Sequence, residues 1–104
     1  MKRPRLVFAD TAVADVVEQA DWYKERAGAP LAKRWEKAVT SALLRILANA
    51  GAGARCTFRH TGLRDVRRAA ITGFPKHLFF YQIQRDEIFI PRIVHGARDL
   101  EHLF

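Results

Sequence analysis

Apolar and polar residues follow two different periods along the chain, which divide it into a helical first half and a strand-rich second half. A short apolar run, Leu6 to Ala9, is followed by Asp10 and Thr11, two residue types that commonly cap helices. Apolar residues then recur at helical spacing until Gly28, with charged residues largely on the other side. The pattern therefore predicts a strand that leads directly into an amphipathic helix.

A second amphipathic helix is predicted between Pro30 and Gly51. Proline suits the first turn of a helix because its missing N–H would have no intrahelical partner there. Apolar residues continue at helical spacing after Pro30, and Gly51 and Gly53 end the pattern. Only a short link separates the two helices, so we expect an antiparallel helical hairpin with Tyr23 and Trp35 in its seam.

The second half shows the alternation and composition of β-strands, after an aperiodic loop. The loop covers Gly51 to Gly62, and the strands cover Leu63 to Ile71, His77 to Gln84 and Glu87 to His95. The segment Thr72 to Pro75 and the pair Arg85-Asp86 are predicted as the connecting turns. The middle strand is apolar on much of both faces, which favours a central position in the sheet. Pro91 lacks a ladder donor, so we expect the last strand to lie at an edge or to be bulged near Pro91.

These elements predict an α+β protein in which a strand, an antiparallel helical hairpin and a three-stranded antiparallel meander follow one another. The helices are expected on one face of the sheet, with the opposite face open. The 104 residues, 49% of them hydrophobic, suffice for one core and indicate a single domain over residues 1–104. No apolar stretch reaches the length of a membrane span or of a signal peptide, so we expect a cytoplasmic protein. The only cysteine, Cys56, excludes an intramolecular disulfide and a zinc site built on paired cysteines.

Positive charge is concentrated in one part of the chain, which has a net charge of +7. The segment from Arg55 to His77 holds five arginines and one lysine against the single acid Asp65. Alternation along the strand places Arg67 on one face, and Arg64 and Arg68 on the other. Two interpretations stay open at this point: a solvated surface, or a site for an acidic partner, either nucleic acid or an acidic protein segment.

Three segments together indicate a known family: Val66-Arg67, the run Gly73 to Tyr81, and the run Ile93 to Asp99. With these segments and this order of elements, nearly the whole chain resembles the RelE/ParE superfamily of toxins from bacterial type II toxin–antitoxin modules, specifically its ParE-like branch. The resemblance implies a toxin neutralised by a cognate antitoxin, whose acidic segment folds over the toxin surface in a hetero-oligomer. ParE-like members poison DNA gyrase without cleaving RNA, whereas RelE-like members cut messenger RNA inside the ribosome. The two activities share a fold, so the fold cannot choose between them.

Residue chemistry separates these activities in part. RNA cleavage through the 2′-hydroxyl needs a base, an acid, and cations that stabilise the charge of the phosphorane. The resemblance makes Arg67, His77 and Arg98 the catalytic candidates of an RNA-cleaving toxin. It also places Phe104, which has no ionisable group, where that branch usually carries a tyrosine. The preferred interpretation is therefore a toxin that binds DNA gyrase. The alternatives are a ribosome-dependent messenger RNA endoribonuclease and an inactive toxin fold that only binds its antitoxin.

The predicted surface for binding the target or the antitoxin combines the cations with the aromatic strand. Its members are Arg64, Arg67, Arg68, Lys76, His77, Tyr81 and Arg98. A structural role stays open for two of them: His77 as a strand-start histidine bonded to the adjacent turn, and Arg98 in an ion pair with Asp99. Trp22 and Trp35 are expected in the core or against a partner. We expect neither a metal nor another cofactor.

Overall fold

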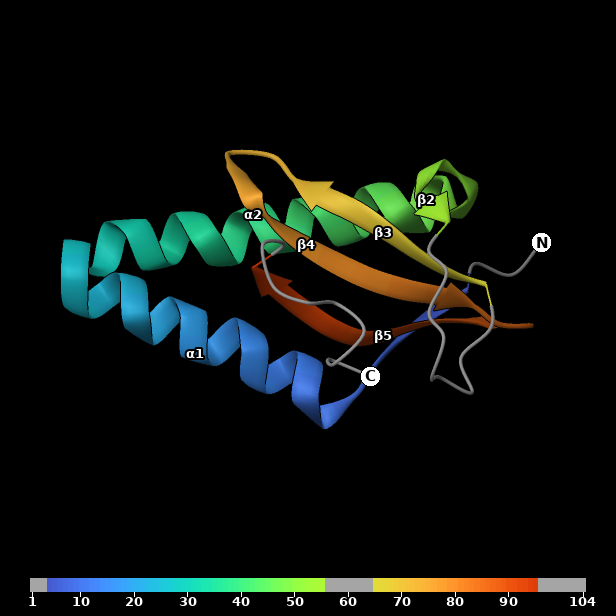
Figure 1. Ribbon diagram of the computed structural model, residues 1–104, viewed down its shortest axis with the longest axis horizontal. Coiled ribbons are helices and arrows are strands. Elements are labelled where there is room, and N and C mark those ends of the chain that lie inside the picture. The colour runs from blue at the N-terminus through green and yellow to red at the C-terminus, as the bar shows by residue number, and fades with distance from the viewer. Residues whose placement is uncertain (1–3, 56–64, 96–104) are drawn as a thin grey trace.

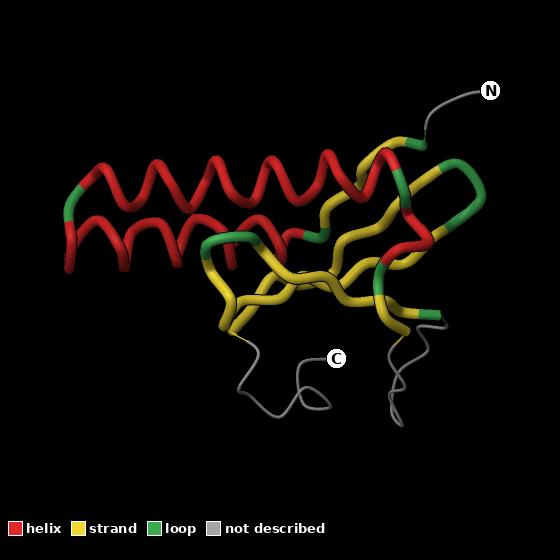
Figure 2. Tube along the Cα trace, turned by 90° about the horizontal axis from the view of Figure 1, so that it is seen from above, coloured by secondary structure: helices red, strands yellow, loops and turns green. Residues whose placement is uncertain are grey.

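The computed structural model describes residues 4–55 and 65–95, and both helices lie on one face of the sheet (Figures 1 and 2). The elements are β1 (Arg5–Phe8), α1 (Asp10–Ala27), α2 (Ala29–Ala48), the 3-10 turn η1 (Ala50–Ala52), β2 (Ala54–Arg55), β3 (Val66–Ile71), β4 (Phe74–Ile83) and β5 (Glu87–His95). The predicted α+β class, helical hairpin and antiparallel meander are confirmed. No helix in the described ranges is long and apolar enough to span a bilayer.

The strands form one five-stranded sheet in the order β1-β5-β4-β3-β2. β1 is parallel to β5 and the other neighbours are antiparallel, so β4 occupies the central position that its apolar faces predict. β4 begins at Phe74 instead of His77, because Gly73 adopts a φ of 88° that lets the turn close early. The two-residue strand β2 was not predicted, since it follows an aperiodic Gly/Ala stretch. The strand predicted over Leu63 to Ile71 corresponds to β3, and its first two residues, 63 and 64, lie outside the described residues.

Pro91 lies at a bulge of β5, directly after the last residue that pairs with β1. β5 pairs with β4 on one side, and from Glu87 to Ile90 it pairs with β1 on the other. The register passes from the pair Phe80–Arg92 to the pair Gln82–Phe89, so β5 contains one more residue than β4 in this interval. Such an extra residue interrupts the ladder, which accommodates a proline that has no N–H. The bulge near Pro91 is confirmed, and from Pro91 onward β5 also lies at an edge, because its pairing with β1 ends at Ile90.

Side chains of α1 close the edge of β5 where β1 ends. Thr11 Oγ1 donates to the carbonyl oxygen of Pro91 at 2.9 Å, and the N–H of Ile93 donates to Asp15 Oδ2 at 3.0 Å. These two contacts take the place of a neighbouring strand. The predicted capping role of Asp10 and Thr11 is wrong, because the N-cap is Ala9 without a side-chain cap bond, and the Thr11 hydroxyl is used by the sheet.

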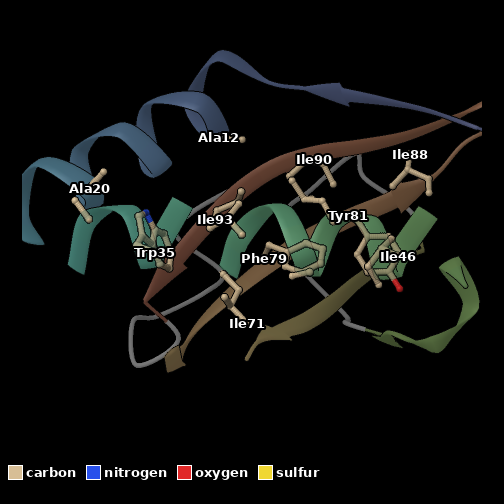
Figure 3. Close-up of a cluster of buried hydrophobic side chains, with 14 residues drawn as sticks. Ala12, Ala20, Trp35, Ile46, Ile71, Phe79, Tyr81, Ile88, Ile90 and Ile93 are labelled. Atoms are coloured by element: carbon tan, nitrogen blue, oxygen red, sulfur yellow. The ribbon is translucent and has the colours of Figure 1, made fainter. Parts of the chain in front are cut away.

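The core fills the space between the helices and the sheet (Figure 3). Trp35 is fully buried, and its Nε1 donates to the carbonyl oxygen of Val16 at 3.1 Å, which ties α2 to α1. The ring centroids of Tyr23 and Trp35 are 6.0 Å apart, which confirms their predicted place in the seam of the hairpin. Phe79 and Tyr81 of β4 are buried beneath the helices, so the central strand supplies the largest side chains of the sheet to this core.

The opposite face of the sheet also carries buried side chains. Register and alternation place Val66, Phe80 and Val94 on the face away from the helices. Their exposed fractions are 1%, 0% and 7%. The expectation of an open second face is therefore wrong at these three positions.

Candidate functional site

The structure separates the predicted binding residues instead of gathering them on one patch. Two of the seven, Arg64 and Arg98, lie outside the described residues. The other five occupy three places: Arg67 with Tyr81 beside the end of α2, Lys76 with His77 next to the β3–β4 turn, and Arg68 on the face away from the helices. The five described residues therefore comprise a structural pair, two residues that line a cleft and one exposed cation.

Tyr81 and Arg67 face each other across β4 and β3, and they hold the link between α2 and β2. The Tyr81 hydroxyl donates to the carbonyl oxygen of Ala50 at 2.6 Å and accepts from the N–H of Gly53 at 2.9 Å. Arg67 Nη1 donates to the carbonyl oxygens of Gly51 and Gly53 at 3.1 and 2.9 Å. Tyr81 is 0% exposed, so it presents no surface to a partner in this structure, and Arg67 is engaged by backbone oxygens.

The closeness of Gly53 to Tyr81 explains why this link needs a glycine. A Cβ atom added to Gly53 would lie 2.7 Å from Cζ of Tyr81 and nearer still to its hydroxyl oxygen. Gly51 and Gly53 follow the helix closely in the sequence, and this pattern predicts only that the helix ends there. The register of β3 and β4 determines which side chain packs against Gly53. The spacing of residues in the sequence does not reveal this register.

Tyr81→Phe is expected to reduce the loss of folding stability that occurs at alkaline pH. Burial raises the pKa of the Tyr81 phenol, although the Gly53 N–H and the Arg67 charge act in the lowering direction. A raised folded-state pKa means that this stability is fully present below the unfolded value of about 10 and is lost as the pH rises through the folded value. We expect denaturant titrations between about pH 7 and 11 to show a shallower alkaline loss for the variant.

The same variant is expected to lose about 1–3 kcal/mol at neutral pH, because the Gly53 N–H and the Ala50 carbonyl lose their shared partner. An alkaline slope identical to that of the unmodified chain would contradict the assignment of the titration to Tyr81.

Lys76 and His77 belong to an aromatic cleft between α1 and the β3–β4 turn. The cleft has a volume of about 700 Å³ and is lined by Gln19, Trp22, Tyr23, Gly73, Phe74, Pro75, Lys76 and His77. His77 is only 6% exposed, and its ring centroid lies 4.7 Å from that of Trp35 and 6.2 Å from that of Tyr23. The imidazole therefore forms part of an aromatic cluster, whereas Lys76 is exposed.

Trp22 lines this aromatic cleft, and Arg26 stacks on its ring. Trp22 is 47% exposed, and the guanidinium carbon of Arg26 lies 4.2 Å from the centroid of its ring. The two residues are four positions apart on α1, a spacing that brings helical side chains together. Sequence reasoning did not pair them, although this i, i+4 spacing was a usable signal. Exposed Trp and Arg beside a cleft are the side chains that most often carry the binding energy of protein interfaces.

The two described candidates for RNA cleavage do not share an exposed site. Arg67 pairs with Tyr81, and His77 lies four residues from Tyr81 along β4, a separation of about 13 Å at the usual strand rise. Arg67 is bonded to backbone oxygens and His77 is buried. Groups that act on one phosphate must reach it within hydrogen-bond distance. Within residues 4–55 and 65–95, no cluster of three or more His, Cys, Asp or Glu side chains is suited to hold a metal.

A helical hairpin on one face of a sheet that ends in an antiparallel meander is the RelE/ParE-like class of α+β fold. The family model described as ParE toxin of type II toxin-antitoxin system, parDE, matches residues 6–100, and the chain belongs to this family. The structure is similar to a solved one described as the chromosomal ParDE TA system from P. aeruginosa, with a TM-score of 0.72 and 20% sequence identity. The match covers 89% of this chain and 96% of that chain. No curated protein matches the sequence.

Proposed function

We propose that this chain is the toxin of a type II toxin–antitoxin module, that it inhibits growth by binding DNA gyrase, and that a cognate antitoxin neutralises it. The observation that supports the proposal most directly is the match of the ParE toxin family model over residues 6–100. A similar fold occurs in a structure described as a ParDE TA system, which supports an antitoxin as a partner of this chain.

The geometry of the described residues favours binding over RNA cleavage. Arg67 is held by the carbonyl oxygens of Gly51 and Gly53, and the ring of His77 is packed against Trp35. Neither side chain is placed to accept or stabilise a substrate phosphate without rearrangement. A toxin that acts by binding needs only a complementary surface, and the aromatic cleft supplies one.

The aromatic cleft is the proposed contact site for gyrase. Trp22, Tyr23 and Phe74 offer apolar walls, Lys76 adds positive charge to the lining, and Arg26 adds a second cation through its contact with the Trp22 ring. A desolvated aromatic centre with a polar rim is the usual anatomy of a protein interface. A complementary partner surface would insert an apolar side chain and place carboxylates near the two cations.

Trp22→Ala and Lys76→Glu are each expected to weaken inhibition of gyrase supercoiling by at least about tenfold, because one removes an aromatic anchor and the other reverses a rim charge. The unmodified protein should arrest growth when it is induced without an antitoxin. The measurements are growth after induction and supercoiling of relaxed plasmid by purified gyrase. Lys33→Glu, an exposed charge reversal on α2 outside the cleft lining, is the matched control and should inhibit like the unmodified protein.

Each alternative gives a different result in the same experiments. Normal growth at confirmed expression would contradict a toxic activity and identify an inactive toxin fold if the antitoxin still binds. Growth arrest with unaffected supercoiling, together with cleavage of messenger RNA on translating ribosomes, would identify an endoribonuclease. Inhibition that is unchanged in both cleft variants would move the gyrase contact elsewhere on the toxin.

A further inference from the structure

Three clefts among the described residues differ in the ligand chemistry that their walls offer. The groove along α1 and α2 is largely aliphatic and carries two acids, Asp21 and Glu36. The groove between α2 and β3 carries two arginines and no aromatic side chain. Of the three, the aromatic cleft combines several rings with a cation, Lys76, and its described lining contains no acidic side chain. Its walls therefore suit a ligand that has a flat ring and a negative charge.

The rings of the aromatic cleft are anchored to the core of the protein. The ring centroids of Trp22 and Tyr23 are 5.5 Å apart, and those of Tyr23 and Phe74 are also 5.5 Å apart. Tyr23 in turn contacts the fully buried Trp35, at a centroid distance of 6.0 Å. Because these rings are already held by packing, little side-chain entropy is lost when a flat ligand binds to them.

Trp22 supplies the exposed stacking surface of the aromatic cleft. Its side chain is 47% exposed, and the guanidinium carbon of Arg26 lies 4.2 Å from the centroid of its ring. Nucleobases stack both on aromatic rings and on the planes of arginine guanidinium groups. Such stacking contributes about 1–3 kcal/mol per base. Trp22 and Arg26 together therefore offer the two kinds of surface on which a base stacks.

The charge of the aromatic cleft favours a ligand that carries a phosphate. Lys76 lines the cleft and is exposed, so its flexible side chain can turn toward a bound anion. Lysine binds a phosphate as a compact point charge with three donors. Arg26 adds a second cation through its contact with the Trp22 ring. A neutral ligand would leave this positive charge without a counterpart.

The size of the aromatic cleft matches a small molecule. Its volume of about 700 Å³ falls within the range of roughly 300–1,000 Å³ that is typical of small-molecule sites. The turn leaves the cleft open, because a Cβ atom added to Gly73 would meet no other atom within 4 Å. We infer that the aromatic cleft binds a free nucleoside 5′-monophosphate, with its base stacked beside Trp22 and its phosphate near Lys76.

A free nucleotide fits the aromatic cleft better than a nucleic-acid strand does. Proteins that bind single strands follow the backbone with a positively charged groove that meets several phosphates in succession. The described residues at this cleft provide two cations, Lys76 in the lining and Arg26 on the Trp22 ring. Two cations and one set of rings correspond to a single nucleotide.

Nucleotide binding is also expected to regulate the proposed gyrase contact, and this consequence rests on the proposed function. Gyrase and the nucleotide would use the same rings, so only one of them can occupy the cleft at a time. A nucleotide present at ten times its dissociation constant should raise the apparent dissociation constant for gyrase about tenfold. The measurement is binding of the protein to immobilised gyrase without ATP, because ATP would itself compete.

The direct test is calorimetric titration of adenosine 5′-monophosphate into the full chain at low salt. We expect it to bind at least about tenfold more tightly than adenosine, which lacks the phosphate, or ribose 5-phosphate, which lacks the base. Lys76→Gln should weaken binding of the monophosphate at least about tenfold and leave adenosine binding unchanged. Trp22→Ala should weaken binding of both ligands. Lys33→Gln, at an exposed position on α2 outside the cleft lining, is the matched control and should bind like the unmodified chain.

Several results would overturn the inference. Equal affinities for the monophosphate and adenosine would exclude a phosphate site, and equal affinities for the monophosphate and ribose 5-phosphate would exclude stacking. Tenfold tighter binding of a 5′-phosphorylated tetranucleotide would assign the cleft to a strand. Nucleotide binding that leaves gyrase binding unchanged refutes only the shared use of the cleft. Nucleotide binding without growth arrest or gyrase inhibition refutes only the proposed function, whereas gyrase inhibition without nucleotide binding refutes only this inference.

Discussion

Asp15→Ala is expected to destabilise the protein by about 3 kcal/mol, because one carboxylate joins α1 to the edge of β5. Asp15 accepts from Arg92 Nε at 2.8 Å, from Arg92 Nη2 at 2.9 Å and from the N–H of Ile93 at 3.0 Å. The side chains of Arg92 and Asp15 are only 23% and 12% exposed. Removal of the carboxylate leaves a partly buried guanidinium and a strand N–H without this acceptor. The bond to Asp15 also raises the pKa of Arg92, so the cation remains charged.

Urea denaturation followed by circular dichroism measures this loss. Asp15→Asn keeps an acceptor for the N–H of Ile93 while removing the charge, so we expect it to lie between the unmodified chain and Asp15→Ala. Asp21→Ala removes an exposed carboxylate from the same helix and should change stability by less than about 0.5 kcal/mol. If Asp15→Ala were as stable as Asp21→Ala, the carboxylate would not hold α1 against β5.

This contact also shows where prediction from the sequence ends. The helices and the meander were predictable because their periods depend on residues close in sequence. Thr11 can cap a helix or donate elsewhere, and the choice depends on the Pro91 carbonyl, 80 residues away. The parallel pairing of β1 with β5 likewise joins distant segments, as does the bond of Ile93 to Asp15. Local pattern cannot resolve such competition.

The candidate site shows the same division. Alternation correctly placed Arg67 and Arg68 on opposite faces of β3, because that relation follows from strand geometry alone. It could not show that backbone oxygens after α2 hold Arg67 while Arg68 is exposed. The aromatic cleft was also out of reach, because it depends on the packing of α1, with Trp22, against the β3–β4 turn. Chemistry was predictable residue by residue, whereas accessibility required the assembled fold.

Gly53→Ala is expected to destabilise the protein by about 3 kcal/mol, although its backbone is ordinary for alanine, with φ −71° and ψ 147°. The cause is steric, because the new methyl carbon would lie 2.7 Å from Cζ and 2.8 Å from Cε1 of Tyr81. Tyr81 is fully buried and cannot swing into solvent. Relief therefore requires the link after α2 to shift, which breaks the bonds of Gly53 to Tyr81 and Arg67.

Gly51→Ala is the matched control, because its nearest neighbour would be Asn49 Oδ1 at 3.9 Å, an ordinary contact. We expect this variant to stay within about 1 kcal/mol of the unmodified chain in the same urea titrations. Tyr81→Leu removes the ring that Gly53→Ala would strike, so the glycine substitution should be less costly in that background. Such non-additivity isolates the contact from other effects of the two changes. Equal losses for Gly53→Ala with and without Tyr81 would show that the glycine is needed for another reason.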